Sequence, residues 1–255
     1  MKIPWPAYLS EFIGTALLVC IGLSFVIFNF GTSSPFVAFL PDAGWRRAIT
    51  GFLFGSTGAI IAISPVGKIS GAHINPVVTL AFHLKKKFSG RDAIAYIIAQ
   101  FLGAIAGALP LLLWGKMGRS VDFGSTVPGN GDSVWAALCG EAITTTALIV
   151  GLFIFLGHKR LRQFTPLLFP FLYALMVWLE APLSGTSTNP ARSLGPAVIA
   201  DVWNDWWIYF LGPLAGMFLG ISLHEFTWLK KLRIEVAKIY HFGHDRYGIF
   251  RKHRR

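Results

Sequence analysis

Hydrophobic residues along the chain gather into six long runs, which are separated by shorter segments rich in polar residues. The runs lie near residues 7–28, 46–64, 92–114, 134–156, 165–181 and 205–226. At about 1.5 Å per residue, a helix of such a length spans most or all of the ~30 Å hydrocarbon layer of a bilayer. The first run contains Glu11 and continues to Phe30, which favours a retained helix over a cleaved secretory signal. The pattern therefore predicts an all-α membrane protein with six transmembrane helices.

The composition agrees with a location in the membrane. Only 14% of the 255 residues are charged, 54% are hydrophobic, and the mean hydropathy is +0.57. Soluble domains contain about 25% charged residues. The two cysteines, Cys20 and Cys139, both lie inside apolar runs. These values exclude a disordered chain and a fold built on disulfides.

The net charge of +11 would suggest a nucleic-acid partner in a soluble chain, but here its distribution bears on topology. If the N-terminus is cytoplasmic, 18 of the 23 Lys and Arg residues lie on the cytoplasmic side. Such a bias is typical of cytoplasmic loops. We expect both termini in the cytoplasm, a plasma or inner membrane, and no nucleic-acid partner.

The chain also contains an internal repeat. The pattern S-G-x-x-x-N-P-x-x-x-L occurs at residues 70–80 and again at 184–194. Each half holds three apolar runs and one N-P segment, and an odd number of spans places the two halves in opposite orientations, as in an inverted repeat. The expected parts are a first repeat at 1–115, an extracellular connecting loop at 116–133, a second repeat at 134–228 and a basic cytoplasmic tail at 229–255.

Each N-P pair predicts the start of a short helix. Asn is a favoured N-cap, and Pro is favoured at the first helical position, so Asn75-Pro76 and Asn189-Pro190 begin helices at 75–84 and 189–200. Each covers about half the bilayer, so each start must be buried in protein or line an aqueous cavity. Two such N-termini, each carrying about +0.5 charge, would repel cations and orient water in opposite senses at the midplane. The Asn side chains can cap these helices while their amides donate to a passing oxygen.

These features resemble the aquaporin and glycerol-facilitator family, above all the T-N-P-A-R-S sequence at 188–193. The resemblance extends from Glu11 to about His224. It implies a passive channel in lipid that needs no cofactor or metal, a homotetramer, and two re-entrant half-helices. One departure is Val77, because the family usually has Ala at this position. The resemblance implies a pore midplane formed by Asn75, Pro76, Val77, Asn189, Pro190 and Ala191.

Arg192 is the only basic side chain deep in an apolar part of the sequence, which marks it as functional. The resemblance places it in the pore constriction together with Thr186, Val177 and Gly55. A one-residue shift would replace Gly55 by Phe54. Water-selective relatives usually have Phe and His where this chain has Gly and Val, so we expect a wider and less polar constriction.

The expected permeants are therefore water and small uncharged solutes such as glycerol, urea, peroxide, ammonia or metalloid acids. Other residues favour a strictly water-selective channel, which is the alternative interpretation. These residues are typical of the water-channel branch of the family, namely Ser193, Ala197, Tyr209 and Phe210.

Two acidic residues, Glu11 and Glu141, lie at equivalent positions of the two repeats. They could relay protons, but we favour a bracing role in which each carboxylate accepts N–H groups of a re-entrant loop. Glu180 would be either solvated or paired with Arg192. His73 could respond to pH, although we favour a role for its backbone. The loop residues expected to line the pore through their backbone are Gly71, Ala72, His73, Gly185 and Ser187.

Three other functions compete with a channel. An ion-coupled transporter can use an inverted repeat, but only Glu11 and Glu141 could bind a coupling ion. A non-conducting scaffold is supported by Val77 alone. No nucleophile–base set, metal cluster or phosphate loop in the sequence favours an enzyme. The basic tail would lie on anionic lipid headgroups or be solvated.

Overall fold

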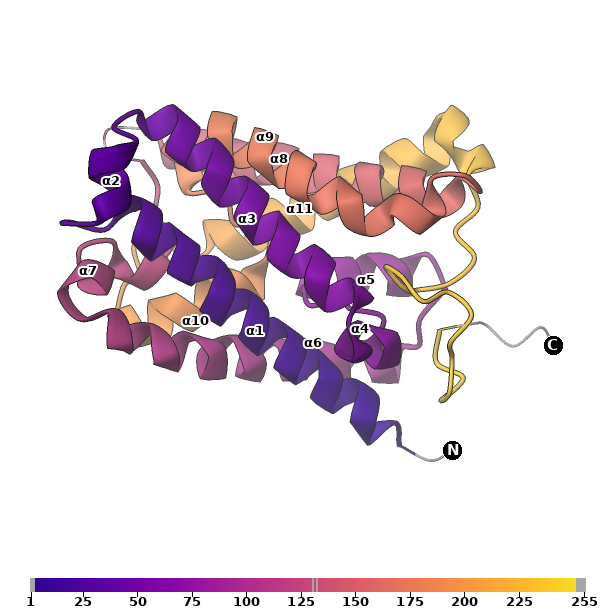
Figure 1. Cartoon of the computed structure of the whole chain (residues 1–255). Helices are drawn as coiled ribbons and strands as arrows, with labels where there is room; N and C mark the ends of the chain where they lie inside the picture. The colour runs from indigo at the N-terminus through magenta and orange to yellow at the C-terminus, as the bar shows by residue number, and fades with distance from the viewer. Residues whose placement is uncertain (1–2, 130, 132, 251–255) are drawn as a thin grey trace.

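A computed structural model describes residues 3–129, 131 and 133–250. All regular elements in these ranges are helices (Figure 1). The six long ones are α1 (Trp5–Phe30), α3 (Ala43–Ile63), α6 (Gly90–Ala108), α8 (Val134–Gly157), α9 (Thr165–Ser184) and α11 (Ile208–Phe226). Each predicted apolar run overlaps one of them, and the predicted six-helix membrane fold is confirmed. The 3₁₀ helix η1 (Leu109–Trp114) and α7 (Gly115–Arg119) continue α6.

The remaining elements are short. Two of them, α5 (Pro76–Leu84) and α10 (Pro190–Ala200), are the half-helices predicted from the N-P pairs. The others are α2 (Pro35–Phe39), α4 (Pro65–Ser70), η2 (Asp122–Gly124), η3 (Arg162–Phe164) and η4 (Trp228–Lys231).

Five of the long helices are long and apolar enough to cross a membrane, counting α6 with its continuation. The sixth, α3, has 21 residues and begins with Arg46 and Arg47, which lower its mean hydropathy. Arg46 is nevertheless buried: its guanidinium donates to Asn29 O at 2.8 Å and lies over the Phe30 ring. Arg192 is therefore not alone as a buried arginine, and Arg46 is held by the end of α1.

Glycines bring the long helices together in pairs. A Cβ added at Gly107 of α6 would lie 2.2 Å from Ala16 O of α1, and one added at Gly216 of α11 would lie 2.3 Å from Ala142 O of α8. A Cβ at Gly51 of α3 would lie 2.2 Å from Tyr173 O of α9. Small residues let helix backbones approach closely in membranes. The pairs α1–α6 and α8–α11 are related across the two halves, and α3 packs along α9.

The C-terminal region folds back against the helices, as the yellow trace in Figure 1 shows near α4 and α5. Full solvation, one of the two expectations for this region, is wrong for its described part, and contact with lipid headgroups stays a prediction. Its apolar side chains are buried against the rest of the protein, namely Ile234, Val236, Ala237, Ile239 and Phe250.

Candidate functional site

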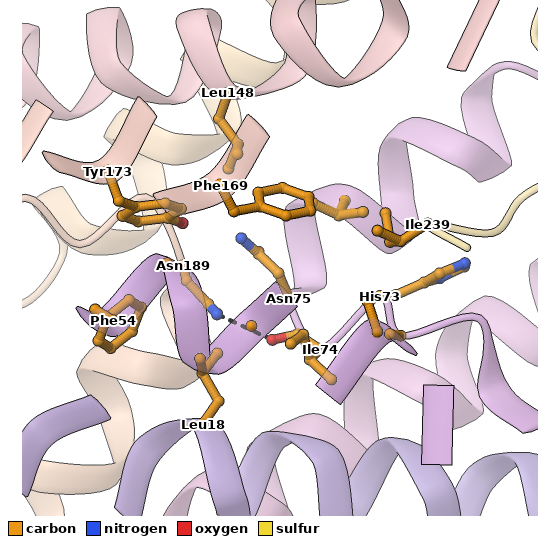
Figure 2. Close-up of a pocket in the computed structure, with 15 residues that line it drawn as sticks. Leu18, Phe54, His73, Ile74, Asn75, Leu148, Phe169, Tyr173, Asn189 and Ile239 are labelled. Atoms are coloured by element: carbon orange, nitrogen blue, oxygen red, sulfur yellow. Dashed lines mark hydrogen bonds between the residues drawn. The ribbon is translucent and has the colours of Figure 1, made fainter. Parts of the chain in front are cut away.

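The N-termini of the two half-helices meet and are tied to each other. Asn75 caps α5, with its Oδ1 accepting Val77 N–H at 3.0 Å, and its Nδ2 donates to Thr188 O at 2.9 Å. Asn189 caps α10, with its Oδ1 accepting Ala191 N–H at 3.1 Å, and its Nδ2 donates to Ile74 O at 3.0 Å (Figure 2). Each asparagine thus fastens its own helix to the opposite loop. An amide carries two hydrogens, so one per side chain is left for the space between the helices.

The third residues of the two N-P motifs lie behind this contact. Val77 and Ala191 are both fully buried in the core of the protein. The cavity beside the asparagines is lined by Val78 of α5 and not by Val77. The two extra methyl groups of Val77 relative to Ala are therefore accommodated in the core. Pro76 and Pro190 are buried at the first turn of each half-helix.

Two buried carboxylates hold the loops that precede the half-helices. Glu11 of α1 accepts His73 N–H at 3.0 Å, Ile74 N–H at 2.7 Å and the side-chain amide of Gln100 at 2.7 Å. Both oxygens of the carboxylate are used. Charge-assisted hydrogen bonds of this kind are stronger than neutral ones.

The second half repeats this arrangement with other residues. Glu141 of α8 accepts Ser187 N–H at 2.6 Å, Thr188 N–H at 2.8 Å and the Ser184 hydroxyl at 2.7 Å. The two glutamates therefore contact equivalent residues of the two loops.

The loops adopt an unusual backbone. Gly71 and Gly185 both have φ of +84°, while Ile74 has φ of +42° and Thr188 has φ of +51°. The left-handed region is unfavourable for β-branched residues, by about 1–3 kcal/mol each. The carboxylates hold this conformation, because the N–H groups of Ile74 and Thr188 are among those that they accept.

A cavity of about 40 Å³ passes the asparagine pair. Phe54 and Tyr173 lie at one end, Asn75 and Asn189 in the middle, and His73 and Ile239 at the other end (Figure 2). One water needs about 10–15 Å³ by this measure, so the cavity holds more than one water molecule. Its walls are mostly apolar, with side chains of Leu18, Leu148 and Phe169.

Arg192 lies beyond the Phe54 end of this cavity. It is buried in the first turn of α10, where its guanidinium donates to Gly124 O at 2.9 Å and its Cζ lies 5.9 Å from the centre of the Phe54 ring. The protein thus combines two facing helix N-termini, a cavity between them and a buried cation at one end.

The sequence matches the family described as Major intrinsic protein over residues 2–224. The chain belongs to the major intrinsic protein family. It is 32% identical over 237 residues to Aquaporin AqpM of Methanothermobacter marburgensis, covering 86% of this chain and 95% of that one. It is 33% identical over 239 residues to Aquaporin-4 of Mus musculus, covering 91% of this chain and 70% of that one. The X-ray structure of the aquaglyceroporin from Plasmodium falciparum aligns with a TM-score of 0.71 at 20% identity, over 88% of this chain and 96% of that one.

This major intrinsic protein is therefore an integral membrane channel protein of the aquaporin and aquaglyceroporin type. The similarity to the solved structure concerns the fold. Both relatives named above are aquaporins, and the helices of this chain form the matching fold.

Two of the residues expected at the constriction, Gly55 and Val177, lie on the packed pair α3 and α9. A Cβ added at Gly55 would lie 2.4 Å from Phe169 O, so this glycine serves the contact between the two helices. The α3 side chain that approaches Arg192 is that of Phe54, the residue reached by the one-residue shift. Val177 is half-buried.

The surroundings of Thr186 contain an acid whose role the sequence left open. Glu180 is neither solvated nor paired with Arg192: it is 7% exposed, and no ion pair joins these two within the ranges that the structure describes. Its carboxyl accepts the hydroxyl of Thr186 and contacts Ser184 Oγ at 2.5 Å. The four-residue spacing of Glu180 and Ser184, which places both on one helix face, was the available signal.

His73 differs from the expectation that only its backbone matters. Its ring is buried among aromatic side chains, with Nδ1 3.2 Å from Thr79 Oγ1 and Nε2 donating to Ala237 O at 2.9 Å. Ala72 lines the cavity next to it. The side chain of His73 thus joins the re-entrant loop to the C-terminal region.

Proposed function

We propose that this protein is a passive channel for water and small uncharged solutes that excludes ions and protons. The observation that carries the proposal is that Asn75 and Asn189, the N-caps of α5 and α10, each donate to the opposite loop beside a cavity. Each amide has a hydrogen left over, so a water molecule passing this point can accept one from each side. Both lone pairs of such a water are then used, so it cannot accept a hydrogen from a neighbouring water in the file.

Exclusion of cations follows from charge. The two helix N-termini together place about one positive charge near the asparagines. The guanidinium of Arg192, fixed by Gly124 O, adds a full charge beyond Phe54. A cation would meet both barriers, while a neutral molecule meets neither.

The roles proposed for Glu11 and Glu141 are structural. The oxygens of each carboxylate accept hydrogen bonds from two backbone N–H groups and one side chain. A coupling ion would have to displace these donors. This arrangement favours a channel over an ion-coupled transporter.

We assign the constriction to Arg192, Thr186, Val177 and Phe54, with Gly55 as a packing residue beside it. The side chain of Val177 cannot form a hydrogen bond, so the wall that α9 contributes to the constriction favours apolar parts of a solute, such as the carbon chain of glycerol. Phe54 narrows the opening from α3 and supports the second candidate, a strictly water-selective channel. The expected order of permeation is water first, then glycerol and urea.

We further propose that both termini are cytoplasmic and that four copies form a tetramer in a plasma or inner membrane. The repeats at 1–115 and 134–228, joined by an outer loop at 116–133, would then place Arg192 toward the outside. The excess of Lys and Arg in the segments assigned to the cytoplasm supports this orientation.

Stopped-flow light scattering of proteoliposomes tests the function. A sucrose gradient should shrink the vesicles faster than empty liposomes, with a low activation energy and no dependence on Na⁺ or proton gradients. Glycerol and urea gradients should give shrinkage followed by re-swelling. Absence of re-swelling would select the water-selective candidate, and saturable ion-dependent uptake would refute the channel. Shrinkage at the rate of empty liposomes, both for the whole chain and for a chain that ends at Arg233, would refute conduction.

A further inference from the structure

A chain of polar side chains leads from the proposed constriction to the bracing carboxylate Glu141. Thr186 Oγ1 contacts Glu180 Oε2, Glu180 Oε1 lies 2.5 Å from Ser184 Oγ, and Ser184 Oγ lies 2.7 Å from Glu141 Oε1. All four residues are buried. Two buried oxygen atoms this close together are joined by a hydrogen bond, so each of the three pairs needs one hydrogen between its oxygens.

Counting hydrogens shows that one of the two acids carries a proton. The hydroxyl of Ser184 has one hydrogen, so it can donate to Glu141 or to Glu180 but not to both. The other contact needs a hydrogen from a carboxyl group. Glu141 accepts two backbone N–H groups, from Ser187 and Thr188, which stabilise its charged form. Glu180 accepts the hydroxyl of Thr186 on its other oxygen and is the acid left to hold the proton.

We propose that Glu180 is a neutral carboxylic acid that fixes the orientation of the Thr186 hydroxyl. Donation then runs in one direction, from Thr186 to Glu180, to Ser184 and to Glu141. The hydrogen of Thr186 points away from the passage, and only its lone pairs face a permeating molecule. Arg192 supplies the donors and Thr186 the acceptor. The effect on selectivity rests on the proposed channel function, whereas the protonation of Glu180 does not.

Infrared spectroscopy of the reconstituted full chain at pH 7 tests the protonation. A protonated carboxyl group has a C=O stretching band separate from that of a carboxylate. The band should be present in the wild type and lost in Glu180→Gln. It should remain in the control Glu235→Gln, which changes an acid paired with Arg162 elsewhere. A spectrum that Glu180→Gln leaves unchanged would overturn the proposal, whether or not the protein conducts.

Flux ratios test the positioning role. A Gln amide can donate to Ser184 and accept from Thr186 as the neutral acid does, so Glu180→Gln should keep the glycerol-to-water flux ratio of the wild type. Glu180→Leu frees the Thr186 hydroxyl to donate into the passage and should change the ratio several-fold. Adding Thr186→Val should remove that change. Equal shifts in the Gln and Leu variants would overturn the positioning role, because a merely structural or charged Glu180 predicts that result.

A second inference concerns the C-terminal segment, residues 234–250. Its backbone is bonded to the first re-entrant loop: Ile239 N–H donates to Gly71 O at 3.0 Å, and Ala237 O accepts from His73 Nε2 at 2.9 Å. His241 Nε2 donates to Ile63 O at 2.8 Å, at the end of α3. The carbonyl of Gly71, expected to line the pore, is thus occupied by this segment.

Side chains of the segment are buried as firmly as those of the core. Lys238 is fully buried, and its Nζ donates to Lys68 O at 2.7 Å and His244 O at 2.8 Å. The Phe250 ring lies 4.6 Å from this Nζ and stacks on Phe88 with centroids 6.0 Å apart. A buried lysine needs such partners, because leaving it unpaired is strongly unfavourable. These contacts show that the C-terminal segment packs closely against the helices of the protein.

Ile239 is the member of the segment that lines the cavity, at the end opposite Phe54 (Figure 2). We infer that the C-terminal segment is a plug that closes this end of the channel when docked. The inference rests on the proposed function, since a plug requires a conducting passage. It predicts a channel that conducts fully only after the segment leaves.

Two variants of the full protein test the plug in proteoliposomes. One chain ends at Arg233, which keeps η4. In the other, Ile239→Asp places a charge in the apolar cavity and disfavours docking. Both should raise water flux per protein at least about fivefold over the wild type. The control Gly243→Ala lies in the same segment with nothing within 4 Å of its added Cβ, and it should match the wild type.

Flux equal to the wild type in both variants would overturn the plug. If that equal flux is also no faster than empty liposomes, the channel function fails with it. Hydrogen exchange adds a readout that needs no flux. The Ile239 amide should be protected in the wild type and exposed in Ile239→Asp, and an unprotected amide in the wild type would also overturn the plug.

Discussion

The bracing of the first re-entrant loop can be tested by removing one oxygen from Glu11. In Glu11→Gln the remaining carbonyl oxygen can accept one backbone N–H, but the new amide faces the other. At least one of the N–H groups of His73 and Ile74 then loses its acceptor, at about 1–3 kcal/mol for a buried donor. Ile74 is also released from its left-handed backbone, with φ of +42°. The loop should therefore open locally well before the protein unfolds.

Hydrogen exchange with residue resolution measures this effect. A loss of about 1–3 kcal/mol corresponds to roughly 5- to 150-fold faster exchange, because about 1.4 kcal/mol is a factor of ten. The affected amides should be those of His73 and Ile74. Glu141→Gln is the matched control: it should speed exchange at Ser187 and Thr188 and leave the first loop unchanged.

Exchange at His73 and Ile74 within twofold of the wild type in Glu11→Gln would refute the bracing argument. Uniformly faster exchange across all helices would refute it as well, since that pattern means global destabilisation.

Three further predictions concern packing, selectivity and pH. Gly107→Ala should lower the thermal unfolding midpoint by several degrees in detergent, because its Cβ would lie 2.2 Å from a backbone oxygen, while Gly151→Ala, with its nearest contact at 3.4 Å, should not. Phe54→Ala should raise the glycerol-to-water flux ratio several-fold and Val177→His should lower it; no change in either would contradict the assigned constriction. Burial lowers the pKa of Lys238 to about 8 in the docked segment, whereas a free lysine has a pKa of about 10.4. Between these pH values the docked segment binds fewer protons than the free one, so docking strengthens as pH rises. Water flux should fall over that window in the wild type but not in the chain ending at Arg233; the charged neighbours of Lys238 are Lys68 and Asp245.

The parts of the fold that the sequence predicted are those governed by local chemistry. Six apolar runs are long enough to span a bilayer, and the start of each half-helix follows from an Asn N-cap and a Pro at the first turn. Both half-helices begin one residue after the predicted start, because Asn75 and Asn189 are the N-caps. Both end at the predicted residues, Leu84 and Ala200, because Lys85 and Asp201 end the apolar stretches.

Counting residues from Asn75 gives Gly55, and the α3 side chain near Arg192 is that of its neighbour Phe54, while both residues line the cavity. The offset depends on the turn between α3 and α4, where Ser64 caps the short helix α4. A difference of one residue in the length of this turn shifts the counted position from Gly55 to Phe54. The glycine pair Gly51 and Gly55, spaced one helical turn apart, was a signal for helix contact.

The C-terminal segment and Glu180 depend on contacts between residues far apart in the chain. In the sequence Lys238 would be taken for a solvated charge, and its burial is explained by the hydrogen bonds to Lys68 O in α4 and to His244 O. The apolar residues Ile234, Val236 and Ile239 within a basic tail were the signal that part of it packs on the protein.

The central claim is a water passage that two opposed helix N-termini make impassable to protons. Its most direct test measures osmotic water flux and the decay of a pH gradient in the same proteoliposomes, using the chain ending at Arg233 and a trapped pH-sensitive dye. Water flux should be well above that of empty liposomes, and pH decay should equal theirs. Water flux at the level of empty liposomes, or pH decay that rises in proportion to water flux, would contradict it.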